Sequence, residues 1–129
     1  MINFVQGKIY TPEDLMKYQG KHKQTTTGMA VIIAQLKNFA VEIVKDAIPG
    51  SSVDEYYIKA GYKDPLFVIQ LYNTEKQAVV EYSWLFSTIL EKCKNKTIEG
   101  EFNMIIRKMV LKFEEKSLIP LSKEVNHIA

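Results

Sequence analysis

The residues from 28 to 47 carry the pattern that most constrains the fold. On a helix, the polar side chains of this stretch recur every three or four positions and form one narrow stripe made of Gln35, Asn38, Glu42 and Lys45. The remaining helix surface is apolar and consists of Met29, Val31, Ile32, Ile33, Leu36, Phe39, Ala40, Val41, Ile43 and Val44. A helix that is apolar on three sides belongs in the middle of a bundle or beneath a partner. Pro49-Gly50 ends this predicted helix.

Two shorter helices are predicted on either side of it. The tetrapeptide TPED at 11–14 offers a threonine cap, a proline suited to the first turn and two acids at the positive end of the helix dipole. This pattern predicts a short helix that stops near Gly20. Ser52-x-x-Glu55 has the form of a capping box, and Gly61 suits a left-handed C-terminal residue. We therefore expect a miniature helix between them.

The second half of the chain contains one ambiguous segment and two clearer ones. Residues 65–72 (PLFVIQLY) fit either a helix or a buried strand, and we favour the helix. Thr74-x-x-Gln77 is a second capping box and predicts a helix to about Lys94. Thr97 suits the cap of a last long helix. The core seam of that helix consists of Phe102, Ile106, Met109 and Phe113.

Together these segments predict an all-α fold: a compact bundle of four to five helices in a single domain over residues 1–129. Residues 2–10 could add a short N-terminal strand. The alternative is an α+β fold with strands near 2–10, 66–72 and 102–113.

Composition fits one globular domain and limits its partners. The 129 residues carry 17 basic against 15 acidic side chains, a net charge of +2, and Arg107 is the only arginine. So small a charge and so little arginine argue against reading of DNA bases. One cysteine excludes an intrachain disulfide. We see no secretory signal, and the apolar stretch at 29–48 has too many polar residues for a membrane span, so we expect a cytoplasmic protein without membrane contact.

The sequence shows no catalytic or cofactor-binding motif. His22 and His127 lack the spacing or the neighbouring carboxylates of a metal site. Cys93 lies on the apolar seam of its predicted helix rather than at a helix N-terminus, where its thiol would be activated. Glycine-rich phosphate loops are absent. We therefore expect neither catalysis, nor a cofactor, nor a metal, nor a small-molecule substrate.

Binding of another protein is the favoured function. Trp84 falls on the polar face of the predicted helix at 74–94, where an aromatic ring could anchor a partner. The candidate contact residues are Trp84, Val80, Met104, Leu111, Tyr56 and Tyr57. We expect an adaptor, an inhibitor or an assembly subunit, of the stoichiometric kind that phages and other mobile elements encode. Its partner would be another protein or, in a homo-oligomer, a second copy of this chain.

Sequence-independent binding of nucleic acid is the alternative function. It requires a basic face, and two lysine clusters could supply one if the fold joins them. The residues concerned are Lys21, Lys23, Lys92, Lys94, Lys96, Arg107 and Lys108.

Overall fold

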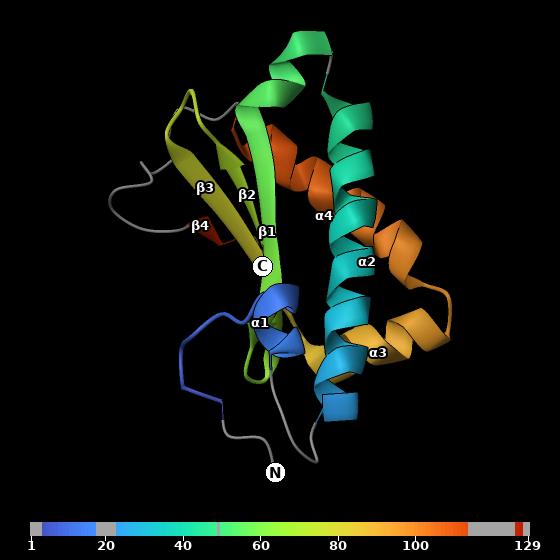
Figure 1. The fold of residues 1–129 in the computed structure, drawn as a ribbon. Helices are drawn as coiled ribbons and strands as arrows, with labels where there is room; N and C mark the ends of the chain where they lie inside the picture. Colours follow the sequence, from blue (N-terminus) through green and yellow to red (C-terminus); the bar gives the residue numbers. More distant parts are fainter. Residues whose placement is uncertain (1–3, 18–22, 49, 114–125, 128–129) are drawn as a thin grey trace.

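The computed structural model describes residues 4–17, 23–48, 50–113 and 126–127 (Figure 1). In chain order the elements are α1 (Pro12–Met16), α2 (Lys23–Ala47), the 3-10 helix η2 (Gly50–Glu55), β1 (Tyr56–Lys63), β2 (Leu66–Asn73), β3 (Ala78–Leu85), α3 (Phe86–Lys94), α4 (Ile98–Lys112) and β4 (Asn126–His127). The fold is therefore α+β, and the predicted all-α helical bundle is wrong.

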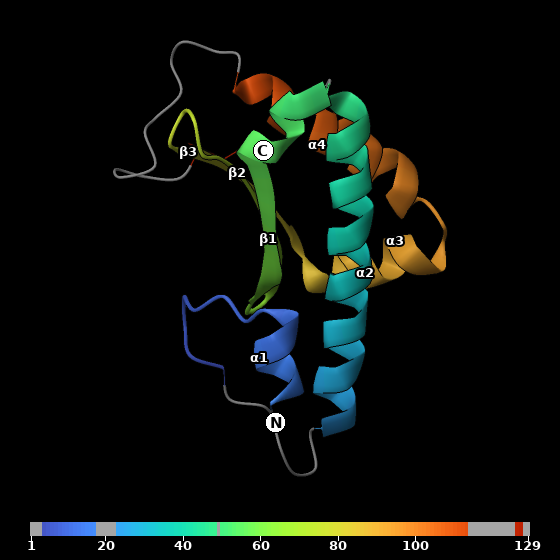
Figure 2. The same cartoon turned by 45° about the horizontal axis from the view of Figure 1, so that its top comes forward.

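The sheet is a three-stranded antiparallel meander with a short parallel addition. Its strand order is β1-β2-β3-β4, and β4 pairs with β3 at Val80 and Glu81. The register places Ile58 beside Leu71, and Leu71 beside Val80. The buried side chains of this row belong to the core that the helices cover, so one face of the sheet packs on the helices (Figure 2). We call the opposite face, which carries Tyr57 and Lys59, the outer face.

The segment at 65–72 forms the central strand β2 rather than the helix we favoured. Phe67, Ile69 and Leu71 face the helices, and each is at most 1% exposed. Val68, which points to the outer face, is equally buried. A central strand covered on both faces gives a continuous apolar run without alternation, which a buried helix also gives.

The predicted helix from 74 to 94 is divided into a turn, a strand and a helix. Residues 74–77 connect β2 to β3, and the backbone N–H of Lys76 donates to Asn73 Oδ1 at 2.7 Å. Gln77 adopts a φ of 48°, so the presumed capping box is a hairpin turn. The strand then runs to Leu85, and helix geometry begins only at Phe86.

The predicted miniature helix is also wrong beyond its first turn. Residues 50–55 form η2, and the chain then enters β1 at Tyr56. Gly61 lies inside this strand instead of capping a helix. A Cβ atom there would lie 2.7 Å from the carbonyl oxygen of Tyr10, so the glycine allows the N-terminal segment to cross the strand closely.

Three of the predicted helices are confirmed. Thr11 and Asp14 form a reciprocal capping box at the start of α1, with bonds of 3.2 and 3.1 Å. Helix α1 ends at Met16, earlier than the Gly20 we expected. Helix α2 matches the long apolar segment, and α4 matches the last predicted helix.

Aromatic rings join the helices to the sheet. Phe102 of α4 is fully buried, and its ring centroid lies 5.1 Å from that of Trp84 and 6.1 Å from those of Phe39 and Phe67. Because these residues come from α4, β3, α2 and β2, the Phe102 cluster fixes the helix layer against the sheet.

Helix α2 resembles a membrane span in its length and apolar composition. Contrary to our expectation, its segment Thr26–Ala47 is long and apolar enough to cross a membrane by length and composition alone. A core helix of a globular domain passes the same test. Ile33, Ala40 and Val44 of α2 are at most 4% exposed inside this domain, where α2 packs against α1, α4 and β1, and a third of the apolar window is buried in this way.

Candidate partner-binding site at the edge of β1

Within the described part of the chain, the outer edge of β1 is paired only at Tyr62. Tyr10 and Tyr62 exchange two backbone hydrogen bonds, of 2.7 and 2.8 Å. The chain that follows Tyr10 turns away into α1, whose first residue, Pro12, has no N–H group to donate. The N-terminal segment therefore cannot continue along the rest of the edge.

Two residues of β1 have outward-facing backbone groups that no described residue pairs with. Tyr62 directs its N–H and C=O groups away from β2, and in a strand residues two apart point the same way. Ala60 and Ile58 therefore also direct these groups outward. Neither residue has a hydrogen-bond partner for them among the described residues. Such an edge is a template for a further strand.

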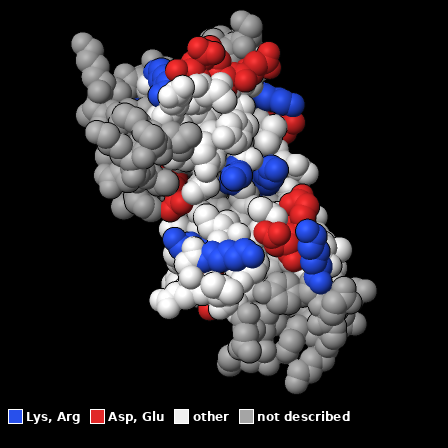
Figure 3. Space-filling view, turned by 60° about the vertical axis from the view of Figure 1, so that its left-hand side comes forward, with Lys and Arg blue, Asp and Glu red and all other residues white. Residues whose placement is uncertain are grey.

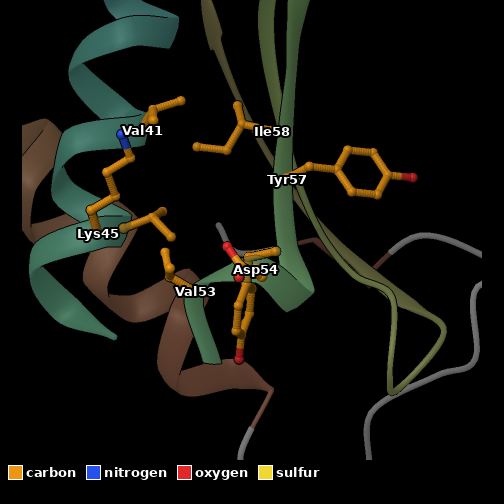
Figure 4. A pocket seen from close by; sticks show the side chains of 8 residues that line it. Val41, Lys45, Val53, Asp54, Tyr57 and Ile58 are labelled. Atoms are coloured by element: carbon orange, nitrogen blue, oxygen red, sulfur yellow. The ribbon is translucent and has the colours of Figure 1, made fainter. Parts of the chain in front are cut away.

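A pocket of about 260 Å³ opens beside this edge, between α2 and β1. It is lined by Val41, Val44, Lys45, Val53, Asp54, Tyr56, Tyr57 and Ile58. Figure 4 shows Val41 and Ile58 pointing toward one another across it, whereas Tyr57 points away. The walls are mostly apolar, and Lys45 and Asp54 each add one charge. A cavity of about 150 Å³ is enough to bind benzene, so this one has room for a large apolar side chain.

The outer face beside the same edge is aromatic and polar. The Tyr57 ring stacks on Tyr72, with centroids 4.6 Å apart and planes 1° from parallel. The Tyr72 hydroxyl donates to Gln70 at 2.9 Å, and Gln70 donates to Glu81 at 2.8 Å. Burial, followed by the nearby Tyr57 and Glu81, raises the pKa of Tyr72. The side chains of Tyr57, Tyr72, Gln70 and Glu81 therefore hold one another in place, with Tyr72 protonated at neutral pH.

The structure separates the predicted protein-binding residues. Trp84 is 7% exposed and Val80 is fully buried, so the predicted solvent-facing position of Trp84 is wrong. The reason is that both lie on the helix-covered face of β3 rather than on a helix. Met104 and Leu111 are exposed on α4. Their roles in binding stay predictions.

Tyr56 and Tyr57 are the predicted residues that reach the edge of β1. Tyr57 is 46% exposed, while Tyr56 is half-buried with its ring centroid 5.4 Å from that of Phe113. The backbone edge at Ile58 and Ala60 was missed because the sequence analysis placed both in a helix. The alternation of Tyr56, Ile58 and Ala60 with exposed residues was the available signal for a strand at this position.

Among the described residues, two members of the lysine clusters are engaged in ion pairs and the others lie apart on α3, its C-terminal end and α4. Lys92 pairs with Glu101 at 3.0 Å, and Arg107 pairs with Asp46. Lys94, Lys96 and Lys108 are exposed on α3, its C-terminal end and α4. Lys21 lies outside the described residues, and the side chain of Lys23 is not described. On the side shown in Figure 3, basic and acidic groups are interspersed.

Catalytic and metal-binding features are equally weak in the described part of the chain. It contains no group of three or more His, Cys, Asp and Glu side chains that could hold a metal. Burial raises the pKa of Cys93, which is opposite to the change that activates a thiol. His22 lies outside the described residues, as does the side chain of His127.

A second cavity, of about 440 Å³, lies between α2 and α4. It is lined by Phe39, Glu42, Ile43, Asp46, Glu99, Gly100, Asn103 and Arg107. Arg107 binds both Asn103 and Asp46 there, so these three polar groups of the lining are engaged with one another. Comparison of the chain with protein-family models, characterised proteins and solved structures gives no match.

Proposed function

We propose that this domain is a non-catalytic protein-binding module that accepts an extended segment of a partner protein as an additional strand on β1. The observation that carries the proposal is the backbone of Ile58 and Ala60, which no other described residue pairs with on this side, directly beside the pocket between α2 and β1. Strand addition uses main-chain hydrogen bonds for affinity and side-chain pockets for specificity. This edge offers both within three residues.

The geometry favours a single extended segment over a second copy of this chain. Helix α2 lies along β1, the edge strand (Figures 1 and 2). If two copies paired through β1, their edge strands would lie about 4.8 Å apart. Packed helices need about 8–10 Å between their axes. Pairing of two copies would therefore also bring their α2 helices toward each other, whereas a single extended segment adds only its own strand.

A proline substitution on the edge tests this proposal. Because the N–H of Ala60 points away from β2, Ala60→Pro blocks an added strand without removing a bond from the β1–β2 ladder. Val41→Lys is a second variant, which places a charge in the pocket. Both should retain the wild-type circular dichroism spectrum. The matched control is Met104→Ser, on the exposed side of α4.

The assay compares the proteins retained from a nuclease-treated lysate of the source cell. We expect a stoichiometric partner that binds the wild type and the Met104→Ser variant but neither edge variant. Retention by the folded Ala60→Pro variant at wild-type levels would contradict strand addition. Loss with Met104→Ser alone would instead assign binding to α4. Retention that disappears on nuclease treatment would favour nucleic-acid binding.

A further inference from the structure

The side chains around the open edge indicate what kind of segment binds there. We propose that the partner segment carries an apolar residue opposite Ile58 and, directly next to it in sequence, an acidic residue opposite Lys59. This inference rests on the proposed function, because it concerns the occupant of the same edge.

The apolar position follows from the alternation of strand side chains. A residue paired beside Ile58 directs its side chain to the same face of the sheet as Ile58. That face opens on the pocket, whose apolar walls come from Val41, Val44 and Val53. An aliphatic or aromatic side chain would fill this space, and a small polar one would leave it empty. We therefore assign the residue opposite Ile58 to the apolar class.

The acidic position follows from the next residue along the strand. Its side chain points to the outer face, beside Lys59. Lys59 is exposed and forms no ion pair with a described residue, and its Nζ lies 5.9 Å from the ring centre of Tyr72. Lys63 lies on the same face four residues further along.

The carboxylates near this position leave Lys59 available. Glu81 lies two strands away on the outer face and accepts a hydrogen bond from Gln70. Asp54 lines the pocket on the other side of β1. Asp64 is engaged by the Tyr62 hydroxyl at 2.6 Å. A carboxylate placed directly opposite Lys59 therefore meets a positive charge that no described carboxylate pairs with.

Three labelled nonapeptides test the inference by fluorescence anisotropy with the full chain. One alternates valine with glutamate, one valine with lysine, and one serine with glutamate. We expect the valine–glutamate peptide to bind about fivefold or more tightly than the valine–lysine peptide, because a cross-strand opposite-charge pair replaces a like-charge pair. The serine–glutamate peptide should bind more weakly than the valine–glutamate peptide, because it leaves the pocket empty.

Charge reversal identifies the residue responsible. Lys59→Glu should invert the preference between the two valine peptides. Lys108→Glu, on the exposed surface of α4, changes the net charge equally and should leave the preference unchanged. An equal shift in both variants would mean general electrostatic attraction and would overturn the inference.

The outcomes separate this inference from the proposed function. Equal binding of both valine peptides, lost in Ala60→Pro, would overturn the acidic position and leave strand addition supported. Binding of no peptide would overturn the inference. The proposed function is tested independently of the peptides, by comparing the proteins that the wild type and the edge variants retain from the lysate. A peptide-induced dimer of this chain would show a different occupant and would also overturn the inference.

Discussion

Replacing Trp84 distinguishes a core residue from a surface anchor. Its indole is 7% exposed, and its ring centroid lies 4.3 Å from that of Tyr82 and 5.1 Å from that of Phe102. Its Nε1–H donates to Glu101 at 2.7 Å, and the same carboxylate binds Lys92. Removing a buried tryptophan side chain costs about 3–5 kcal/mol. Trp84→Ala should therefore remove much of a typical domain stability of about 5–15 kcal/mol.

Trp84→Phe separates packing from hydrogen bonding in the same site. The phenyl ring retains most of the contact with Phe102 but cannot donate to Glu101. A hydrogen bond to a charged group contributes about 1.5–3 kcal/mol, and the partial exposure of Glu101 places this bond at the lower end. We therefore expect Trp84→Phe to cost about 1.5 kcal/mol.

The assay is urea unfolding followed by far-ultraviolet circular dichroism, because these variants lack the only tryptophan. Met104→Ala is the control, and its exposed site predicts a change within about 0.5 kcal/mol. A Trp84→Ala variant that loses less than about 1 kcal/mol of stability would refute the placement of this ring in the core.

Three further predictions concern the sheet and α4. Burial, the hydrogen bond to Asp64 and the charge of Asp64 raise the pKa of Tyr62 from 10.0 to about 12, so the stability that this residue contributes below pH 10 should fall as the pH rises to 12. The urea midpoint of the Tyr62→Phe variant should fall less over this pH range than that of the wild type, and parallel curves for the two proteins would contradict the shift. Gly61→Ala should cost about 1–3 kcal/mol in thermal unfolding, because its Cβ meets the Tyr10 carbonyl oxygen. Gly100→Ala, in open space on α4, should instead stabilise the protein by about 0.5–1 kcal/mol, and destabilisation there would be inconsistent with the helix.

The sequence was sufficient to predict the long helices. In α2 and α4 the apolar residues keep a helical period over four or more turns, so the pattern is unambiguous. In α1 the reciprocal bonds of Thr11 and Asp14 are local, and they need no tertiary contact to form. Features that depend on a few neighbouring residues were therefore predictable.

The strands were missed where apolar residues fit both the helical spacing of three to four residues and the two-residue alternation of a strand. Val79, Tyr82 and Phe86 have helical spacing, yet the first two lie on opposite faces of β3 and the third begins α3. In β1, Gly61 suggested a helix end, although its role is to admit the Tyr10 backbone. That contact joins residues far apart in sequence, so only the tertiary structure reveals it.

The candidate site was predictable only in part. Tyr57 was singled out as a candidate contact residue, and it lies beside the outer edge of β1. The outward groups of Ile58 and Ala60 have no partner in the described N-terminal segment because the chain leaves the sheet after Tyr10. Whether the edge of a strand is paired depends on which other segments lie beside it. The pattern of side chains within the strand does not contain this information.

Residue-resolved amide hydrogen exchange along β1 tests strand addition most directly. In the free protein, the amides of Ile58 and Ala60 should exchange rapidly, while those of Tyr57 and Lys59, which bond to β2, should be protected. The valine–glutamate peptide should slow exchange at Ile58 and Ala60. Protection of these two amides in the free protein, or their continued rapid exchange in the saturated complex, would contradict the proposed binding mode.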